Sequence, residues 1–416
     1  MTEVEIVNTA IFQHLSGDLP HSADVVVIGG GVNGAATAFQ LAKRGVNRVL
    51  LLERRQIGAG ATGKSGALVR AHYSNVSESQ LTLESLKIFW NWEAEVGFGN
   101  PRFEQTGFFR LVKPEDTDKL QANVAAQQAI GVDTRLVDPY EINQIEPLIR
   151  TDDLTLGAYE PDSGYADPNA TTYGYIEGAI HYGAVVRSQT EVTGIVVTGG
   201  KVTGVETTAG TVATESIVLA GGAWADRILT PIGVDLPIEP HRVRVAVFRW
   251  PAEMDQNRKH AVVIDSTNHA WLRPEGIAST LIGMEHAHDR IDPDTFDESV
   301  EWEYVQRCKE TLAGRLPIFE SATMRGCWSG VVMQSKDNHP IIGKAAEVDG
   351  LLLMTGDSGS SFKTAPATGI VLAEWIIDGE PKLMDMHPFR PSRFAEGQPW
   401  VDEFAYDQTK EVTISR

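Results

Sequence analysis

The chain has 416 residues, of which 42% are hydrophobic and 22% are charged, a composition typical of a globular protein long enough to form two lobes. Its formal net charge of −20 at pH 7 argues against nucleic acid as a partner. No apolar run approaches the roughly 18 residues that a transmembrane helix needs, and the two cysteines, Cys308 and Cys327, indicate neither a disulfide framework nor a metal site.

The first predicted elements form one continuous unit after a short extension. Residues 1–22 contain no lysine or arginine, so they are predicted to be an extension on the surface and not a signal peptide. The apolar run 25–28 predicts a buried parallel strand, which a glycine-rich turn and a helix follow. A second apolar strand over 49–52 ends on Glu53, nineteen positions after Gly34.

The glycines of this turn, Gly29, Gly31 and Gly34, stand at G-x-G-x-x-G spacing. The first allows a tight strand-to-helix turn, the second lets backbone approach a pyrophosphate, and the third lets helix and strand pack closely. The helix N-terminus adds unpaired N–H groups and the positive end of its dipole. Glycines that served packing alone would not account for Glu53, which stands where an acid accepts hydrogen bonds from ribose hydroxyls. The unit therefore predicts dinucleotide binding.

The remaining predicted elements mix helices and strands. After Glu53 the chain enters a loop rich in Gly, Ala, Ser and Thr, where backbone can press against a flat ring. Periodicity and helix-boundary signals predict helices over 76–96, 114–128, 138–145, 170–181, 294–313 and 365–378. Apolar and alternating runs predict strands over 103–112, 185–188, 191–198, 201–207, 211–214, 217–220, 242–250, 261–266, 269–273, 280–284, 326–333 and 351–355.

Three parts of this pattern carry more detailed predictions. Glycine turns separate the strands between 185 and 214, which predicts a β-meander or hairpins. Arg242, Arg244 and Arg249 alternate with apolar residues, which predicts a long strand with one solvated face. Residues 384–416 hold three prolines and are predicted to be an irregular tail.

Several further motifs carry a resemblance to a known family. They are the segment Gly66–Tyr73 with Arg70, and the stretches YEPDSGYAD at 159–167, IVLAGGAWA at 217–225, DNHPIIG at 337–343 and GDSGSSFKTAPATG at 356–369. With the dinucleotide unit, the chain resembles the FAD-dependent amine oxidases of the D-amino-acid oxidase superfamily over nearly its whole length. It is most similar to the sarcosine oxidases, especially the beta subunit of the heterotetrameric enzyme.

The resemblance implies an α/β fold with a Rossmann-like FAD domain and a substrate domain that contains a large mixed β-sheet. The FAD domain is expected to be discontinuous, from residues 23–102, 157–236 and 336–383. The substrate domain is expected over 103–156 and 237–335, with the extension 1–22 and the tail 384–416 outside both.

The resemblance also implies the residues that bind FAD. They are Gly29, Gly31, Gly34, Glu53, Arg54, Thr62, Ser65, Gly66, Val192, Gly221, Trp224, Gly359, Ser360, Phe362 and Lys363. Gly330 stands where the monomeric sarcosine oxidases tether FAD through a cysteine, and 167–171 contains no histidine for the second flavin of the beta subunit. We therefore expect one noncovalent FAD, no FMN and no metal.

Five residues are candidates for the chemistry. By the resemblance, Lys363 lies against the flavin and activates oxygen, since a cation stabilises superoxide and reduced flavin as they form; contact with a phosphate or carboxylate, or a structural role, is the alternative. Arg70 and Arg273 are candidates to bind a substrate carboxylate. Glu285 replaces a family histidine and could bind a cationic amine, unless a one-residue shift gives that histidine role to His286.

These observations predict oxidation of a C–N bond in a small, secondary amine or amino acid. Hydride passes to flavin N5, the imine hydrolyses, and oxygen reoxidises the flavin to give hydrogen peroxide. The alternatives are a dehydrogenase that passes electrons to a quinone or partner protein, and a flavin-holding subunit of a hetero-oligomer that is inactive alone. A NAD-dependent dehydrogenase is a third alternative and ranks below these. The sequence leaves open whether the chain forms a homo-oligomer. The few cysteines are typical of a cytoplasmic protein.

Overall fold

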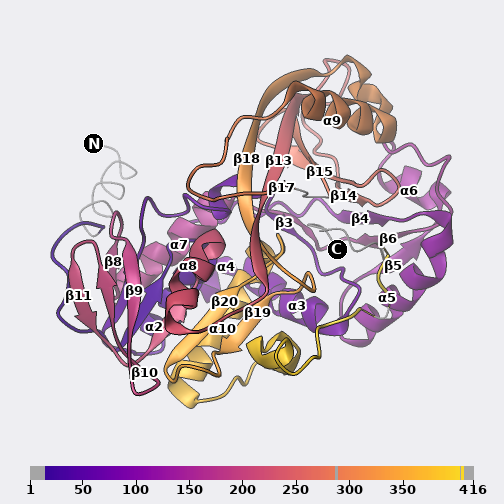
Figure 1. Ribbon diagram of the computed structural model, residues 1–416. Coiled ribbons are helices and arrows are strands. Elements are labelled where there is room, and N and C mark those ends of the chain that lie inside the picture. Colours follow the sequence, from indigo (N-terminus) through magenta and orange to yellow (C-terminus); the bar gives the residue numbers. More distant parts are fainter. Residues whose placement is uncertain (1–14, 286–288, 403, 407–416) are drawn as a thin grey trace.

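The structure is a computed structural model that describes residues 15–285, 289–402 and 404–406. Figure 1 shows two lobes, each built around its own sheet. The long antiparallel strands β13 (Ile238–Arg249) and β18 (Thr323–Ser335) run side by side from the middle of the molecule into the second lobe. The lobes are therefore joined by regular structure as well as by loops.

The first lobe is built on a six-stranded sheet in which all neighbours are parallel except at one edge, where β19 runs antiparallel to β20. All six strands are short, and the four in the middle are buried on both faces, which is why each of those four appears in the sequence as an apolar run. In spatial order they are β19 (Ile341–Lys344), β20 (Leu351–Thr355), β12 (Ile217–Leu219), β1 (Val25–Ile28), β2 (Val49–Leu52) and β8 (Val185–Arg187).

Alternate residues of β1 face different layers, as the period of two in a strand requires. Val25 and Val27 pack in the core under the helices α2 (Val32–Lys43), α3 (Val76–Trp90), α4 (Trp92–Glu95), α7 (Pro168–His181) and α10 (Ser361–Asp378). Val26 and Ile28 pack under an antiparallel sheet of β9 (Val192–Thr198), β10 (Lys201–Thr207) and β11 (Gly210–Ala213). The parallel sheet is thus covered by helices on one face and by a β-meander on the other.

Small residues let α10 cross α2 closely. A Cβ atom on Gly369 would lie 2.9 Å from the Cβ of Ala36. This close contact holds α10 against the helix that follows the glycine turn, so the N-termini of both helices approach the same region.

The second lobe is built on a nine-stranded mixed sheet. β17 (Asp289–Arg290), β16 (Ser279–Met284) and β18 all pair with β13. From β16 the order continues through β15 (Ala270–Glu275), β14 (Val262–Asp265), β4 (Phe108–Leu111), β6 (Gly157–Glu160) and β5 (Arg135–Val137). The helices α5 (Thr117–Ala129), α6 (Pro139–Ile145) and α9 (Trp302–Arg315) belong to this lobe, and α9 buries Cys308 and Leu312 in its core.

The predicted fold class is confirmed: a Rossmann-like α/β unit is combined with a large mixed sheet. The domain boundaries stay a prediction, although β6, which begins the expected segment 157–236, pairs in the nine-stranded sheet. One strand assignment was wrong, because β8 extends the parallel sheet beside β2 instead of joining the meander. It follows helix α7, and a strand that follows a crossover helix returns to the parallel sheet.

Two helix boundaries and one strand face also differ from the prediction. α9 begins at Trp302 and not near 294, because the side chains of Asp292 and Asp297 accept hydrogen bonds from backbone N–H groups two residues ahead and hold turns there. α10 begins at Ser361, so Lys363 lies in its first turn. Arg242 is buried against Glu301 at 2.8 Å, because α9 and its approach cover that part of the strand.

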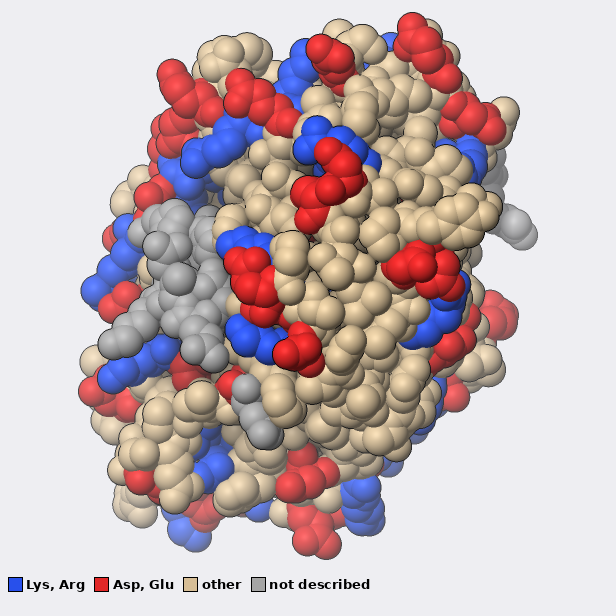
Figure 2. All heavy atoms as spheres, turned by 90° about the vertical axis from the view of Figure 1, so that its right-hand side faces the viewer, with Lys and Arg blue, Asp and Glu red and all other residues tan. Residues whose placement is uncertain are grey.

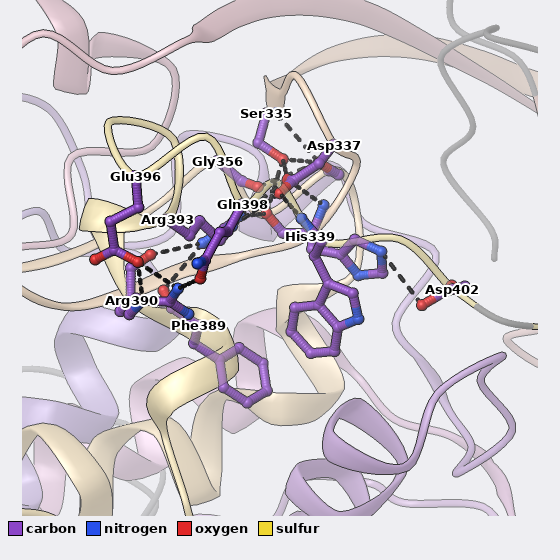
Figure 3. A network of polar contacts seen from close by, with 12 residues as sticks. Ser335, Asp337, His339, Gly356, Phe389, Arg390, Arg393, Glu396, Gln398 and Asp402 are labelled. Atoms are coloured by element: carbon purple, nitrogen blue, oxygen red, sulfur yellow. Dashed lines mark hydrogen bonds and ion pairs between the residues drawn. The ribbon is translucent and has the colours of Figure 1, made fainter.

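The C-terminal segment returns to the first lobe through a polar network (Figure 3). The buried Arg393 donates to both carboxylate oxygens of Asp337, at 2.8 and 2.9 Å. His339 contacts Asp402 at 3.4 Å in the same network. On its other side, His339 contacts Glu78 at 2.8 Å. Residues 384–402 form only short turns, close to the predicted irregular tail, but they are anchored to the lobe through buried charges.

The surface carries mixed charges. Figure 2 shows acidic and basic side chains interspersed on the face that carries much of the second lobe, around an uncharged central area. Within the part of the chain that the structure describes, no helix combines the length and apolar character that a membrane crossing requires.

Candidate active site

A cavity of about 470 Å³ lies between the two lobes. Its floor is the carboxyl end of the parallel sheet, where ligands of open α/β sheets bind, and its roof is the sheet of the second lobe. The floor residues include Ile28, Leu52 and Ala220, which end β1 and β2 or follow β12. The roof residues are Val243, Arg244 and Val245 of β13, Ile264 of β14, Trp271 of β15 and 330–333 of β18.

The glycine turn has the geometry that the sequence predicts. Gly29 has φ of +110°, and a Cβ there would lie 2.3 Å from the carbonyl oxygen of Ala220. A Cβ on Gly34 would lie 1.9 Å from the carbonyl oxygen of Gly29, so only glycine lets α2 pack against the turn. Gly31 lines the cavity and carries no side chain between its backbone and that space. The turn thus presents backbone N–H groups of a helix N-terminus to the cavity.

Glu53 lies on the cavity wall at the end of β2. Its carboxylate accepts hydrogen bonds from the N–H of Gly30 at 2.7 Å and of Arg55 at 2.7 Å. The two bonds, one to each oxygen, fix the carboxylate beside the glycine turn and leave each oxygen with a further acceptor position. This is the arrangement expected of an acid that accepts hydrogen bonds from a ribose.

The loop of small residues lines the next part of the cavity. The hydroxyl of Thr62 accepts from the N–H of Val32 at 3.1 Å, so it satisfies one of the first donors of α2. Ser65 and Gly66 line the cavity beside it. The indole of Trp271 lies so close that a Cβ on Gly66 would come within 2.4 Å of it. The backbone of this loop and a flat aromatic side chain therefore pack directly on each other at this part of the cavity.

The outer part of the cavity is lined by a stacked pair. The guanidinium carbon of Arg54 lies 4.7 Å from the centre of the Trp224 ring. Asp294 accepts a hydrogen bond from both side chains, each at 2.8 Å. Val192 and Gly221 also line the cavity.

The N-terminus of α10 closes the inner end. Gly359, Ser360, Phe362 and Lys363 line the cavity. The Lys363 ammonium donates to the carbonyl of Ser360 at 3.2 Å and lies 5.1 Å from the centre of the Tyr73 ring. Its side chain is buried, so the protein holds a cation where water is scarce.

Asp357 is the acid beside this lysine. Its carboxylate accepts from the hydroxyl of Ser361 at 2.5 Å and from the N–H of Gly359 at 3.1 Å. Burial raises the pKa of Asp357, and the hydrogen bonds and the charge of Lys363 only partly oppose it. The amide of Asn33 donates to Ser361 at 3.1 Å, so this network joins the N-termini of α2 and α10.

Arg70 reaches the same end of the cavity from the loop before α3. Its guanidinium carbon lies 4.5 Å from the centre of the Tyr73 ring, so this one ring contacts both Arg70 and Lys363. Burial lowers the pKa of Arg70, while the nearby Glu160 favours its charged form. The inner end therefore combines two buried cations.

Two predicted catalytic residues are not on the cavity wall. Arg273 donates to the carbonyls of Gly66 and Pro274 and forms an ion pair with Glu275 at 2.7 Å. Its guanidinium is therefore bound by protein groups outside the cavity. Its place just outside the loop lets it hold the backbone of Gly66.

Glu285 is buried in the second lobe, where it pairs with Arg110 at 3.8 Å and contacts His269 at 3.7 Å. It is therefore a partner of a buried arginine and does not line the cavity. His286 lies outside the described residues.

Several cavity residues were missed as candidates in the sequence. Asp357 stands in the GDSGSSFK motif, only six positions before Lys363, so the motif itself could have indicated it. Trp271 also lines the cavity, where its indole spans Gly66 and Gly283. Lys64 lines the cavity beside Gly330, whose added Cβ would lie 3.1 Å from the Lys64 Cβ. No local pattern predicts that contact, because β18 is far away in the sequence.

The residues present fit a dinucleotide with a ring system. The glycine turn and helix N-terminus suit a pyrophosphate, Glu53 suits a ribose, and the loop of small residues under Trp271 suits a planar ring. All the predicted cofactor residues line this cavity except Gly34, which packs behind the turn.

Comparison with known proteins agrees with this geometry. Residues 24–375 match the DAO family, described as FAD dependent oxidoreductase. The chain is 29% identical over 417 residues to mitochondrial sarcosine dehydrogenase of Homo sapiens, a match that covers 96% of this chain and 45% of that protein. It is 26% identical over 386 residues to sarcosine oxidase subunit beta of Rhodobacter capsulatus, covering 91% and 90% of the two chains. The chain thus spans about half the length of the first of these relatives.

Solved structures give the same result. The structure of L-proline dehydrogenase from P. horikoshii has a TM-score of 0.85 and 28% identity, covering 92% of this chain and all of that one. Glycine oxidase from Geobacillus kaustophilus has a TM-score of 0.78 and 26% identity, covering 90% and 99%. The predicted resemblance is therefore confirmed.

Proposed function

The chain belongs to the DAO family of FAD dependent oxidoreductases, which act on amine C–N bonds, and we propose that its substrate is an amino acid with a secondary amine. The observation that carries this proposal is the pair of buried cations, Arg70 and Lys363, on the single ring of Tyr73 at the inner end of the cavity. Both cations line the cavity, so a substrate carboxylate bound there is attracted by both, and the planar guanidinium of Arg70 can bind it through two hydrogen bonds.

Each part of the cavity has a separate task in this proposal. Bound FAD supplies the acceptor for the hydride that leaves the α-carbon of the amine. The glycine turn and Glu53 bind its phosphates and ribose, and the backbone near Ser65 and Gly66 supports its ring. Arg70 and Lys363 bind the carboxylate and so orient the C–N bond. The remaining steps need no strong acid or base if the amine binds neutral, because the imine hydrolyses in water.

The roof of the cavity restricts the rest of the substrate. Val245, Ile264 and Trp271 present apolar surface opposite the loop of small residues. An N-alkyl group or a ring is compatible with this wall, whereas a second charge on the substrate would lose its hydration there. The roof therefore favours small apolar substituents on the amine nitrogen or on the α-carbon.

The electron acceptor proposed from the sequence is molecular oxygen, with hydrogen peroxide as product. A dehydrogenase that passes electrons to a quinone or a partner protein is the second candidate. It is favoured by the relatives named dehydrogenases, one at 29% identity and one with a TM-score of 0.85. A partner subunit is also proposed, from the relatives named sarcosine oxidase subunit beta.

The free thiols Cys308 and Cys327 support a cytoplasmic location.

Anaerobic mixing of the yellow protein with amines tests the proposal. Loss of the oxidised flavin absorbance should follow sarcosine or L-proline at a lower concentration than the matched amines without a carboxylate. Dimethylamine is the control for sarcosine, and pyrrolidine is the control for L-proline. Equal reduction by an amino acid and its control would contradict carboxylate binding. Readmission of oxygen, or addition of an artificial quinone, then separates an oxidase from a dehydrogenase.

A further inference from the structure

Residues 289–301, which we call the strap, run from β17 to α9 and cross from the second lobe to the rim of the cavity. The contact with the first lobe centres on Asp294. Its Oδ1 accepts hydrogen bonds from Nη2 of Arg54 and Nε1 of Trp224, each at 2.8 Å, and its Oδ2 accepts from Nη1 of Arg227. All three donors line the cavity.

Two more acids of the strap contact basic residues of the first lobe that line the cavity. Asp292 pairs with Arg227 at 2.5 Å, and Glu298 pairs with Lys64 at 2.5 Å. The strap therefore places three carboxylates along one edge of the cavity. It contacts the first lobe after β2, in the loop of small residues and near helix α8 (Ala225–Leu229).

These contacts do more than a set of separate surface ion pairs, which contribute little each. Arg54 and Trp224 stack on each other, and the same carboxylate oxygen accepts from both, so Asp294 fixes the two side chains relative to each other. Burial would raise the pKa of Asp294, but the hydrogen bonds from Trp224 and Arg54 and the charges of Arg54 and Arg227 lower it, which agrees with a carboxylate held ionised in this position.

We propose that Asp294 is a positioning residue for the cofactor: it holds Arg54 and Trp224 at the cavity wall, and the strap thereby keeps the bound dinucleotide from leaving. The proposal rests on the placement of FAD in this cavity, which belongs to the proposed function. It predicts that release of FAD requires the strap to separate from the first lobe. Because the contacts are charged and partly exposed, that separation depends on salt.

The test is the rate at which the holoprotein releases FAD after dilution, followed by the rise in flavin fluorescence. Asp294→Asn keeps the size and removes the charge, and we expect release about fivefold faster or more at low salt, the scale of losing a partly exposed network of ion pairs and hydrogen bonds. Added salt should accelerate release from the wild type and have a smaller effect on the variant. Asp294→Glu keeps the charge and should restore most of the salt dependence.

Asp152→Asn is the matched control, because it changes the net charge equally and removes an exposed ion pair with Arg150 that lies away from the cavity lining. This control should release FAD at the wild-type rate.

Amide hydrogen exchange of 289–301 provides a second readout, with faster exchange expected in the Asp294→Asn holoprotein. If Asp294→Asn fails to fold, Glu298→Gln takes its place. If the strap variant releases FAD and exchanges its amide hydrogens at the wild-type rates, the proposal is overturned. If the wild-type protein itself binds no FAD, the assignment of the cofactor site is overturned instead.

Discussion

The Lys363 ammonium lies 5.1 Å from the centre of the Tyr73 ring. The guanidinium of Arg70 lies 4.5 Å from the same centre, and both cations are buried. Like charges repel strongly where water is scarce, and the aromatic ring, Asp357 beside Lys363 and Glu160 near Arg70 offset this repulsion. Because both side chains also line the cavity, a substrate carboxylate bound at its inner end would be attracted by both. This relationship is why we expect the inner end of the cavity to bind a carboxylate.

The first prediction is that FAD is bound noncovalently. Gly330 stands at the predicted tether position and has no side chain that could bond to a flavin. Heat or acid precipitation should therefore release all the flavin into the supernatant. Flavin fluorescence that stays on the denatured polypeptide band would contradict this.

Replacing Glu53 tests the ribose assignment. Glu53→Ala should weaken FAD binding by roughly ten- to hundredfold, because one charge-assisted hydrogen bond contributes about 1.5–3 kcal/mol. The variant also loses the bonds from Gly30 and Arg55, so the thermal unfolding of the apoprotein must be compared with that of wild type. Titration of the apoproteins with FAD gives the affinities. Unchanged FAD affinity would remove Glu53 from the site.

Arg70 tests the shape of the carboxylate site. Arg70→Lys keeps a charge but loses the fork, so it should reduce substrate use less than Arg70→Ala does. Flavin reduction at a series of substrate concentrations measures the effect. Dimethylamine should distinguish the variants less than sarcosine does, because it has no carboxylate. Equal kinetics for wild type and both variants would show that Arg70 does not contact the substrate.

The parts of this site that could be predicted from sequence are those built from local patterns. Gly29, Gly31 and Glu53 lie within one strand–turn–helix–strand unit, and the spacing fixes how they meet. Lys363 was predicted at the cavity through the resemblance carried by its motif, and the structure places it in the first turn of α10. The buried apolar runs likewise predicted four strands of the parallel sheet, which are β1, β2, β12 and β20.

The remaining parts depend on contacts between distant segments. Arg273 was a candidate to bind a substrate carboxylate, but it donates to the Gly66 carbonyl because β15 packs over that loop. Glu285 pairs with Arg110, which comes from a strand far earlier in the chain. Asp294 was predicted to begin a helix, and only the position of the second lobe brings it to Arg54. Such pairings have no periodicity that a single sequence could reveal.

A buried histidine predicts part of the response to acid. His260 contacts Thr280 at 2.7 Å, and burial lowers its pKa from 6.5 to about 4. Because the folded-state pKa lies below the unfolded value, its contribution is present above the unfolded pKa and is lost as pH falls toward the folded one. Between about pH 7.5 and about pH 5 this removes about 2 kcal/mol from the free energy of unfolding.

Urea unfolding at several pH values should show this loss. His260→Gln should flatten the dependence in this range, even if the variant is less stable at neutral pH. His387→Gln, which changes an exposed histidine, should keep the wild-type dependence. If the free energy of unfolding depends on pH equally in wild type and His260→Gln, another group is responsible for the loss.

The last prediction separates the two roles considered for Lys363. Lys363→Met keeps the length of the side chain and removes its charge. If Lys363 binds the carboxylate with Arg70, the variant should need roughly ten- to hundredfold more amino acid for anaerobic flavin reduction, the scale of one charge-assisted hydrogen bond. Reoxidation by oxygen should then keep its wild-type rate. If Lys363 instead activates oxygen, reduction should survive while reoxidation slows by roughly a hundredfold, the scale of losing one preorganised electrostatic group. Stopped-flow absorbance times the two half-reactions separately, and because the cation lies on the same ring as Arg70, we expect the first result.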